Sequence, residues 1–474
     1  MAVDYDLVIV GGTVQGRRGA ALAAREGARV ALVEPPGAVD RILNNQVALE
    51  LLTQAVGGLG GFGSLKLGKS AVDGADWAVV RQRLPWAVEL AAESLSSATL
   101  AAMGVDVVEG LGQFSPKPRL AFTTADRRLR ARGYGLCPPT QATVPAIPGL
   151  ASTPYHTLDD LADWDDLPES AVILGRSPQA IALAQCLALL GRPVTLLSRG
   201  DQLLPTEDGD MSLFGEQILR AAGVEVRLGQ RPRVITYDGQ FRVELADGAT
   251  LHRQQLILGT AHQAMIEGLN LEALGLRPGA QRIPVDERLR TVHPRMFAWG
   301  PALGGYWATA TGFQDVPIAV RNALYWPYRQ RLTLHQPSLL PTVPALGRVG
   351  MTAHQAQRWF GSDASVIQVY LGQTLATHLA GDITGLCRWV VHRDGRLLGA
   401  QTWGTCARDL IQTVAGMMQN NLRIQHWERI SALPHSHTEI LAQMVDAWQQ
   451  QRWQPGTRRR DWAENWCNWR RSRA

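Results

Sequence analysis

The sequence predicts an α/β fold, because one plan of strand, glycine turn, helix and strand occurs twice. In the first copy DLVIV leads into GGTVQG at 11–16, and RVALVE ends at Glu34. In the second copy AVILG ends at Gly175, and PVTLLS ends at Ser198. The first glycine and the last strand residue are 23 positions apart in both copies, 11 to 34 and 175 to 198. Continuous apolar strands at this spacing are typical of parallel sheets covered on both faces, so two Rossmann-like units are expected.

Length and composition indicate a folded protein of several domains. The 474 residues correspond to two to four domains of about 100–200 residues. Hydrophobic and charged fractions of 46% and 19% exclude a disordered chain, and a net charge of +5 is too small to indicate nucleic acid binding. No apolar run reaches the ~18–20 residues of a membrane span, and Asp4 and Asp6 stand where a secretory signal is basic. A cytoplasmic protein is therefore expected.

The five cysteines are dispersed, at 137, 186, 387, 406 and 467. No two of them have C-x-x-C or C-x-x-x-x-C spacing, which argues against a disulfide framework, a zinc site and a redox dithiol. They are expected to be buried or incidental thiols, and no metal site is predicted.

The first glycine turn has most of the features of a dinucleotide site. Gly11 and Gly16 occupy the first and third glycine places, whereas Thr13 adds bulk at the second, where backbone approaches a pyrophosphate. Glu34 stands where a carboxylate accepts hydrogen bonds from a ribose hydroxyl. Arg17 lies in the first helical turn, where the helix dipole disfavours a cation unless an anion binds there. The alternative is a packed unit with an empty turn.

The second glycine turn departs further from the pattern. Gly175 is kept, but Ser177 and Ala180 take the second and third places. Ser198 and Arg199 end the second strand without an acid, a pair that suits the 2′-phosphate of NADP better than NAD. The alternative for Arg199 is a solvated loop arginine.

Turn and proline signals organise the remaining chain. GVDVVEGLGQF and RLAFTT predict a hairpin or small sheet, and prolines between 138 and 148 mark a domain connection. GVEVRLG, QFRVELADGATL and LILGT complete the second sheet, and DVPIAVRNALYW predicts a helix. Prolines from 327 to 344 mark the next boundary. Beyond them CRWVVHRDGRLLGAQTWG predicts a hairpin turning at Asp394-Gly395, followed by the helices DLIQTVAGMMQNN and EILAQMVDAWQQQ.

From DLVIVGG to HSHTEIL the order of these pieces resembles the flavoprotein pyridine nucleotide-disulfide oxidoreductases, such as dihydrolipoamide dehydrogenase, glutathione reductase and mercuric reductase. The strongest stretches are VALVEP, VPAIPGL, DQLLPTEDGDMSLFGEQILRAAGVEVRLG, LNLEALGL, VDERLRTVHPRMFAWG and CRWVVHRDGRLLGAQTWG. The resemblance implies a homodimer with an FAD-binding domain split around an NAD(P)-binding domain, then an α+β dimerisation domain. The expected limits are 1–150 with 265–330 for FAD, 151–264 for NAD(P), 331–452 for the interface and 453–474 for a tail.

The resemblance also assigns the cofactor-binding residues. Glu34 would hold the adenosine ribose, the backbone from Thr13 to Gly16 would face the pyrophosphate, and Gly112 would lie beside the adenine. The expected FAD site comprises Gly11, Gly12, Thr13, Val14, Gln15, Gly16, Glu34, Pro35, Gly112, Gly300 and Pro301. The expected NAD(P) site comprises Gly175, Ser177, Ser198 and Arg199.

The chemistry of that family depends on residues that this sequence replaces. Its C-x-x-x-x-C dithiol would fall within 35–52, which contains no cysteine. In its H-P-x-x-x-E motif, Glu439 is kept but Pro434 replaces the proton-shuttling histidine, which leaves His435 and His437 as weak candidates. Its flavin-binding G-D pair reads Gly300-Pro301, and proline offers no acceptor side chain and no N–H.

These replacements predict a flavoprotein that does not reduce disulfides and that passes electrons, if active, to another acceptor. The alternative is a catalytically silent nucleotide-binding or regulatory homodimer. The tail RRRDWAENWCNWRRSRA places Trp462, Trp466 and Trp469 on one helical face. This face is expected to pack on the body of its own dimer, with contact to an anionic membrane surface as the alternative.

Overall fold

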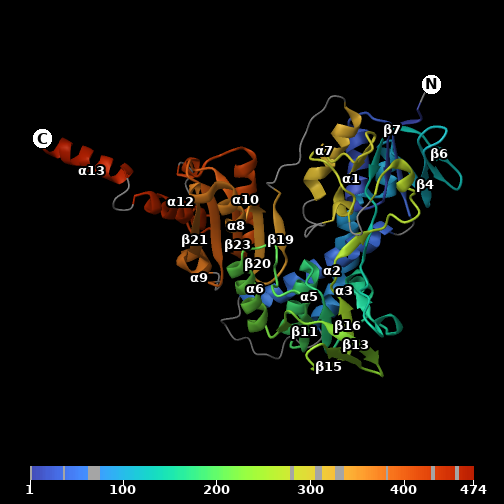
Figure 1. The fold of residues 1–474 in the computed structure, drawn as a ribbon, viewed down its shortest axis with the longest axis horizontal. Helices are drawn as coiled ribbons and strands as arrows, with labels where there is room; N and C mark the ends of the chain where they lie inside the picture. The colour runs from blue at the N-terminus through green and yellow to red at the C-terminus, as the bar shows by residue number, and fades with distance from the viewer. Residues whose placement is uncertain are drawn as a thin grey trace. The chain divides into compact units, whose positions relative to one another are not determined.

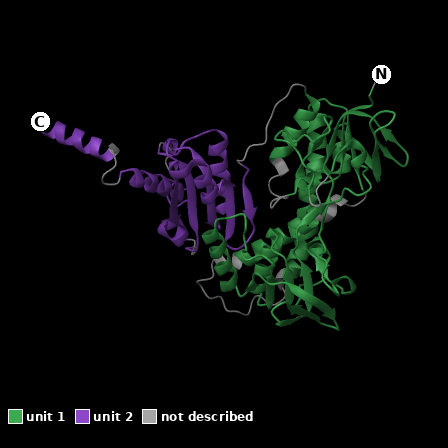
Figure 2. Cartoon of the chain, in the orientation of Figure 1, with its two compact units in different colours: residues 1–58, 67–333 green, residues 59–66, 334–474 purple. Residues whose placement is uncertain are grey.

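The computed structural model describes residues 3–35, 38–61, 75–277, 282–304, 312–325, 336–379, 383–428, 433–453 and 458–473. The chain divides into two compact units, 1–58 with 67–333 and 59–66 with 334–474 (Figure 2).

The first sheet of unit 1 is parallel and has the order β18-β7-β1-β2-β3. Its strands are β1 (Tyr5–Val10), β2 (Val30–Glu34), β3 (Asp106–Glu109), β7 (Ala131–Leu136) and β18 (Met296–Ala298). Leu7 pairs with Val30 and Val10 pairs with Val33, so β1 and β2 end at the same edge. All five residues of β2 are buried, as expected for a parallel sheet covered on both faces.

Two helices cover one face of this sheet, α1 (Val14–Arg25) and α7 (Gly312–Leu324), which lie side by side (Figure 1). Their alanines and valines share a core with Trp299, which is fully buried just after β18. The Nε1 of Trp299 donates to the carbonyl of Gln15 at 3.1 Å. A side chain at Gly135 would place its Cβ 2.0 Å from the same ring. Trp299 therefore fixes the glycine turn against the centre of the sheet.

The second sheet of unit 1 is also parallel, with the order β12-β11-β10-β16-β9. Its strands are β9 (His156–Thr157), β10 (Ala171–Leu174), β11 (Val194–Leu197), β12 (Glu225–Arg227) and β16 (Gln255–Leu258). The helices that accompany it are α5 (Pro178–Leu189) and α6 (Gly209–Ala221). The antiparallel strands β13 (Pro232–Tyr237), β14 (Phe241–Leu245) and β15 (Thr250–Arg253) form a separate sheet.

Smaller elements complete unit 1. One small sheet contains β4 (Gly112–Ser115), β5 (Ala121–Thr124) and β6 (Arg128–Leu129), and another pairs β8 (Thr140–Ala142) with β17 (His262–Ala264). The small sheet predicted from GVDVVEGLGQF and RLAFTT is therefore correct only in part, because DVVE is β3 of the parallel sheet. The remaining helices are α2 (Ala38–Gly61), α3 (Ala75–Ala92) and α4 (Ser97–Ala102). The side chain of Asn45 on α2 donates to the carbonyl of Asp159 and accepts from the backbone N–H of Ala162 at 2.7 Å. Helix α2 is thereby attached to the chain segment that leads into the second sheet.

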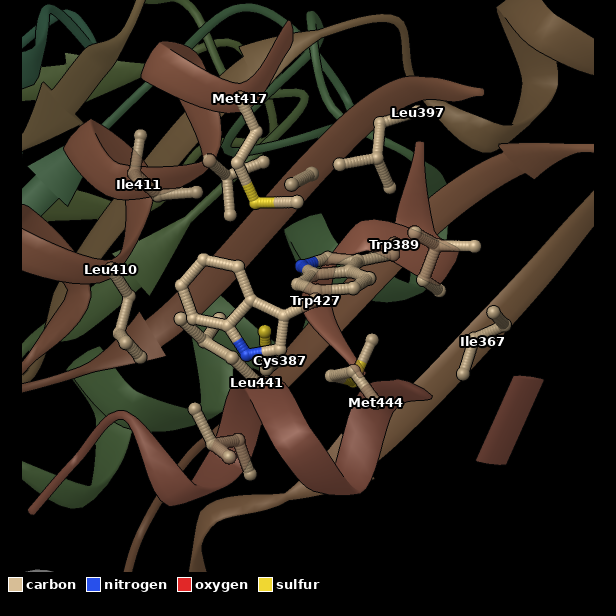
Figure 3. Close-up of a cluster of buried hydrophobic side chains, with 14 of the residues drawn as sticks. Ile367, Cys387, Trp389, Leu397, Leu410, Ile411, Met417, Trp427, Leu441 and Met444 are labelled. Atoms are coloured by element: carbon tan, nitrogen blue, oxygen red, sulfur yellow. The ribbon is translucent and has the colours of Figure 1, made fainter. Parts of the chain in front are cut away.

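Unit 2 contains an antiparallel sheet of order β19-β20-β23-β22-β21. Its strands are β19 (Ser338–Leu340), β20 (Ala345–Gly350), β21 (Ala364–Tyr370), β22 (Leu386–His392) and β23 (Leu397–Gly404). Its helices are α8 (Ala353–Phe360), α9 (Leu375–Leu379), α10 (Ala407–Gln419), α11 (Ile424–Trp427), α12 (Glu439–Arg452) and α13 (Arg458–Arg471). Trp389 and Trp427 pack with Met417 and Met444 in its core (Figure 3).

The predicted α/β class, with two parallel sheets followed by an α+β region, is confirmed. The hairpin predicted at Asp394-Gly395 is the connection of β22 and β23. Helices α2 and α3 were not among the predicted elements, and all of the proposed domain limits, including those of the interface domain and the tail, stay a prediction.

The close packing around Trp299 generates a stability prediction. Trp299→Ala removes a fully buried indole and its hydrogen bond to Gln15, and is expected to lower the free energy of unfolding by about 3–5 kcal/mol. Trp359→Ala is the control, because Trp359 is 76% exposed and its loss is expected to change stability by less than about 0.5 kcal/mol. Urea unfolding followed by circular dichroism measures both. Equal effects of the two variants would contradict the proposed anchoring role.

Candidate nucleotide and flavin site

The first glycine turn leaves no room for side chains at two positions. Gly11 has φ +119°, and a Cβ there would lie 1.9 Å from the carbonyl oxygen of Cys137. A Cβ on Gly16 would lie 2.2 Å from the carbonyl oxygen of Gly11. The ends of β1 and β7 and the start of α1 therefore meet backbone to backbone, as the sequence predicts for a dinucleotide-binding turn.

Thr13 fills the place of the second glycine with a buried side chain. It is the N-cap of α1, and its Oγ1 accepts from the backbone N–H of Gly16 at 3.2 Å. The same oxygen lies 2.8 Å from Sγ of Cys137. One of the N–H groups at the helix start, which would otherwise face a phosphate, is thus bound by the protein itself.

Glu34 ends β2 as predicted, but its carboxylate is already paired. Arg17 Nη2 donates to Glu34 Oε1 at 2.6 Å, and Arg17 Nε donates to Glu34 Oε2 at 3.1 Å. A third bond joins Arg17 Nη1 to the carbonyl of Leu95 at 2.9 Å. The side chains of Arg17 and Glu34 are only 13% and 4% exposed. The cation expected to await an anionic ligand is therefore neutralised within the chain, at the position expected for the ribose.

A buried acid stands beside the Gly300-Pro301 turn. The backbone N–H of Gly300 donates to Asp315 Oδ2 at 2.8 Å, and Asp315 is only 5% exposed. Its Oδ1 is enclosed and has no hydrogen-bond partner among the described residues. Burial raises the pKa of this carboxyl, with the Gly300 N–H opposing the effect. Gly300 itself has φ +70°, and Pro301 is buried.

Sequence reasoning missed both Arg17 as a partner of Glu34 and Asp315 as a site residue. Each had a signal, since Arg17 is a cation in the first turn of a helix and Asp315 is an acid at the start of an apolar helix. Neither signal identifies a partner 15 or more positions away along the chain.

Cys137 lies where the turns at Gly11 and Gly300 meet. It is fully buried, its Sγ is bound to Thr13, and a Cβ on Gly300 would lie 3.0 Å from it. Burial raises the pKa of this thiol well above its usual range. Cys137 is thus a packing residue of the turn and a poor nucleophile.

The other predicted FAD-site residues have packing roles that the structure shows directly. Gln15 is buried and accepts from Trp299 through its carbonyl. Gly12 is buried and Val14 is half-buried in the same turn, and Pro35 follows β2. Gly112 begins β4, where a Cβ would lie 2.5 Å from the carbonyl of Thr123. The site residues at the ends of β1 and β2 come together, whereas Gly112 is placed by its own small sheet.

The second glycine turn keeps its backbone geometry. Gly175 has φ +121°, and a Cβ there would lie 2.2 Å from the carbonyl of Gly259. Ser177 caps α5 by accepting from the backbone N–H of Ala180 at 3.2 Å. Ser198 is buried, and Arg199 is exposed.

A second arginine, Arg176, lies at this turn and was not among the predicted site residues. Arg176 donates to the carbonyl of Gln202, and a Cβ on Gly200 would lie 2.4 Å from its Nη1. Two arginines, Arg176 and Arg199, therefore flank the end of β11.

Among the described residues of unit 2, no hydrogen bond between side chains joins the three candidate catalytic residues to one another. Glu439 Oε1 accepts from the backbone N–H of His435 at 2.6 Å, and His435 is exposed with φ +61°. The Nε2 of His437 is enclosed and has no hydrogen-bond partner among the described residues. Glu439 thus binds a main-chain group, and no described contact links it to an imidazole. The described residues hold no group of three His, Cys, Asp or Glu side chains placed to bind a metal.

Comparison with protein families decides the relationship, because residues 5–323 match the model of pyridine nucleotide-disulphide oxidoreductases. The chain belongs to this family. Residues 336–443 match the family's dimerisation domain, which supports a homodimer. Members of the family are FAD- and NAD(P)-dependent flavoproteins.

The similar proteins are named for different activities. The chain is 31% identical over 310 residues to a mercuric reductase of Acidithiobacillus ferrooxidans, covering 63% of this chain and 54% of that protein. It is 28% identical over 326 residues to the probable pyridine nucleotide-disulfide oxidoreductase RclA of Escherichia coli, covering 67% and 73%. The chain thus spans about half the length of the first relative.

Solved structures of this family share the fold over nearly the whole chain. The Cu(II) complex of the HOCl-induced flavoprotein disulfide reductase RclA from Escherichia coli has a TM-score of 0.79 and 25% identity, covering 94% of this chain and 99% of that one. LpdA from Mycobacterium tuberculosis has a TM-score of 0.82 at 20% identity, covering 93% and 99%.

Among the described helices, none has the length and apolarity needed to cross a bilayer.

The described residues fit the family's flavin dinucleotide in outline. The close glycine turn, the acid ending β2 and the enclosed, unpartnered Oδ1 of Asp315 are groups that a dinucleotide could use. The Arg17–Glu34 ion pair takes one acceptor position on each oxygen of the Glu34 carboxylate, so Arg17 would compete with a ribose for this group.

Replacing Arg17 tests this competition. Arg17→Leu leaves the Glu34 carboxylate buried without its partner, so the free energy of unfolding of the apoprotein is expected to fall by about 3 kcal/mol. Added FAD is expected to bind at least about tenfold more tightly than to the unmodified chain, because the ribose no longer displaces a guanidinium. Thermal unfolding with and without FAD, and fluorescence titration of FAD, measure the two effects.

Arg18→Leu is the matched control, since Arg18 is the exposed neighbour on the same helical turn. It is expected to leave the FAD-dependent shift unchanged. Weaker FAD binding by the Arg17 variant would show that Arg17 contacts the cofactor and does not compete with it.

Proposed function

We propose that this chain is an FAD-dependent NAD(P)H oxidoreductase that passes electrons to an acceptor other than a disulfide. The observation that supports this most directly is that helix α2 contains no cysteine. This helix follows β2, the place where the resemblance puts the dithiol, and its 24 residues include no cysteine. A disulfide relay needs an accessible thiolate there.

The cysteines present elsewhere are poor substitutes. Cys137, Cys186, Cys387 and Cys406 are buried, and Cys467 alone is exposed. Burial raises the pKa of Cys186 and of Cys387 to about 12, so both remain protonated thiols at neutral pH. The Sγ of Cys186 lies in hydrogen-bonding contact with the hydroxyl of Thr53, and the Sγ of Cys387 accepts a hydrogen bond from the hydroxyl of Thr402.

FAD would be held by the first sheet of unit 1. The backbone from Thr13 to Gly16 and the carboxylate of Glu34 would take the pyrophosphate and the ribose. Asp315 would take over the role of the acid that Pro301 replaces, because its Oδ1, which has no hydrogen-bond partner among the described residues, would accept from a hydroxyl beside Gly300. FAD, when bound, would supply the hydride-accepting ring, and the residues named here bind and orient it.

The second sheet would select NADP over NAD. Arg199 and Arg176 follow β11 and β10 at this turn, and Ser198 stands at the strand end where an acid would bind a free ribose. Guanidinium groups favour a 2′-phosphate at this position.

The proton side of the reaction would need no histidine. A quinone-type acceptor takes two electrons from NADPH and two protons, one delivered with the hydride and one from solvent, which gives a quinol and NADP. Such an acceptor leaves no thiolate to be protonated, which agrees with the engagement of Glu439 by the backbone of His435.

A second function has one observation in its favour. The Arg17–Glu34 pair and the Thr13 cap satisfy the groups that would bind a dinucleotide. A homodimer that binds nucleotide weakly or not at all, and that acts as a scaffold, is the alternative.

Cofactor content and acceptor range test the proposal together. The purified protein, reconstituted with FAD, is expected to release stoichiometric FAD on denaturation and to oxidise NADPH with 1,4-benzoquinone. No turnover is expected with glutathione disulfide, lipoamide or Hg²⁺. Iodoacetamide is expected to modify Cys467 alone in the native protein and to leave the quinone turnover unchanged, as judged by mass spectrometry and assay.

The two alternatives give opposite results. Disulfide turnover that iodoacetamide abolishes would refute the thiol-free proposal. Failure to retain FAD after reconstitution would leave the scaffold reading.

Asp315→Asn probes the buried acid through its pH dependence. The folded-state pKa of Asp315 is raised above 3.8, so ionisation destabilises the apoprotein as the pH rises above that value. The variant is therefore expected to unfold at higher urea than the unmodified chain at pH 7, with the difference vanishing below about pH 4. It is also expected to retain less FAD, because an amide is a weaker acceptor for a hydroxyl than a carboxylate.

Asp4→Asn is the control of opposite sign. Arg130 lowers the pKa of Asp4, so this carboxylate stabilises the fold above pH 3.8 and its loss lowers stability slightly at pH 7. Unchanged FAD retention in the Asp315 variant would remove Asp315 from the cofactor site.

A further inference from the structure

The C-terminal helix α13 presents an exposed row of aromatic rings. Trp462, Trp466 and Trp469 are 66%, 47% and 44% exposed. Their rings stack on one another, with centroids 6.0 Å apart at 9° and 5.0 Å apart at 28°. The guanidinium of Arg473 lies 4.3 Å from the centroid of Trp469. In the single chain these indoles therefore contact each other and leave much of their apolar surface in water.

Nearly all of the net charge of the protein lies in the same segment. Residues 458–474 contain six arginines and two acids, a net charge of +4, whereas the whole chain has 47 basic and 42 acidic residues, a net charge of +5. The preceding 457 residues, with 41 basic and 40 acidic side chains, carry +1. The tail is thus a local cationic group on a nearly neutral body.

Arginines accompany the row of tryptophans, although the helix has no purely basic face. Arg470 lies on the flank of the row at 3.6 residues per turn, and Arg473, just beyond the end of α13, packs on the ring of Trp469. Glu464 falls on the side opposite the tryptophans, together with Arg460 and Arg471. A surface that meets the tryptophans therefore meets Arg470 and Arg473 and avoids Glu464.

We propose that α13 binds an anionic lipid surface, with its tryptophans in the headgroup region and its arginines on the phosphates. Indole rings prefer this interfacial zone, and arginine pairs with phosphate through two parallel hydrogen bonds. The helix is polar on its other side and too short to cross a bilayer, so it lies on the surface.

Charge also argues against the other occupants. A second copy of α13 would bring arginines to arginines in either orientation, because both ends of the helix are basic. The sequence predicts that α13 packs on the body of its own dimer. Charge gives this arrangement little support, because the preceding 457 residues carry a net charge of +1 and so have no surplus of acids. An acidic lipid surface supplies the missing charge.

Vesicle flotation with the full-length protein tests the proposal. Binding is expected to phosphatidylcholine vesicles that contain phosphatidylglycerol, at least about tenfold above binding to phosphatidylcholine alone, and is expected to fall as salt is raised. The triple variant Trp462→Ala, Trp466→Ala, Trp469→Ala, and a separate variant with Arg470, Arg471 and Arg473 changed to Gln, are each expected to lose it. The double variant Trp86→Ala, Trp359→Ala is the control, since both side chains are exposed outside the tail, at 66% and 76%.

Three results would overturn the proposal. The first is equal flotation with neutral and anionic vesicles, or none with either. The second is binding to duplex DNA in place of vesicles. The third is loss of dimer or a lower melting temperature when 458–474 are deleted, which would show that the tail packs on the protein. Because FAD content is not involved in these readouts, they stand or fall separately from the proposed redox function.

Discussion

The buried ion pair between Arg17 and Glu34 is the constraint on which the nucleotide chemistry of this fold depends. A guanidinium in the first turn of α1 opposes the helix dipole, and burial of the Glu34 carboxylate at the end of a fully buried strand is costly unless the charge is paired. Each group therefore stabilises the other, and the carbonyl of Leu95 satisfies a further donor. Such a pair repays its desolvation only with good geometry, which the two parallel hydrogen bonds provide. A ribose at Glu34 would share the carboxylate with Arg17 or displace the guanidinium.

The same turn shows why the architecture persists when its chemical groups change. Gly11 and Gly16 are fixed by backbone atoms about 2 Å from where a Cβ would lie, and this requirement holds whether or not a ligand binds. Thr13 is compatible with the turn because its hydroxyl caps the helix. Packing rules therefore preserve two parallel sheets, whereas ligand binding rests on side chains that can be exchanged without disturbing the core.

The sequence predicts what is local and fails where partners are distant. Strand, turn and helix around Gly11 and Gly175 follow from spacing and hydrophobic pattern. The prediction that QFRVELADGATL completes the second sheet is wrong, because its strands form a separate antiparallel sheet. Glu34 can be identified from the sequence because it ends a strand at a fixed spacing after Gly11. Its ion pair with Arg17 depends on side-chain direction, and the bond from Gly300 to Asp315 depends on how α7 packs against β18. Helix α2 has no strong periodic signal of its own.

The replaced residues separate into two groups by cause. Under the proposed function, a histidine that protonates a thiolate would have no task without thiols in α2, and Pro434 and the binding of Glu439 to a main-chain N–H would follow from that single missing step. The proline at 301 would differ, because holding a flavin is needed with or without a dithiol. A chain that keeps the flavin would have to supply the acceptor from another element, and α7 brings Asp315 to the adjacent backbone N–H with its Oδ1 unpartnered among the described residues. The enclosed Oδ1 of Asp315 would destabilise the protein without FAD, whereas bound FAD would supply a hydrogen-bond donor to it.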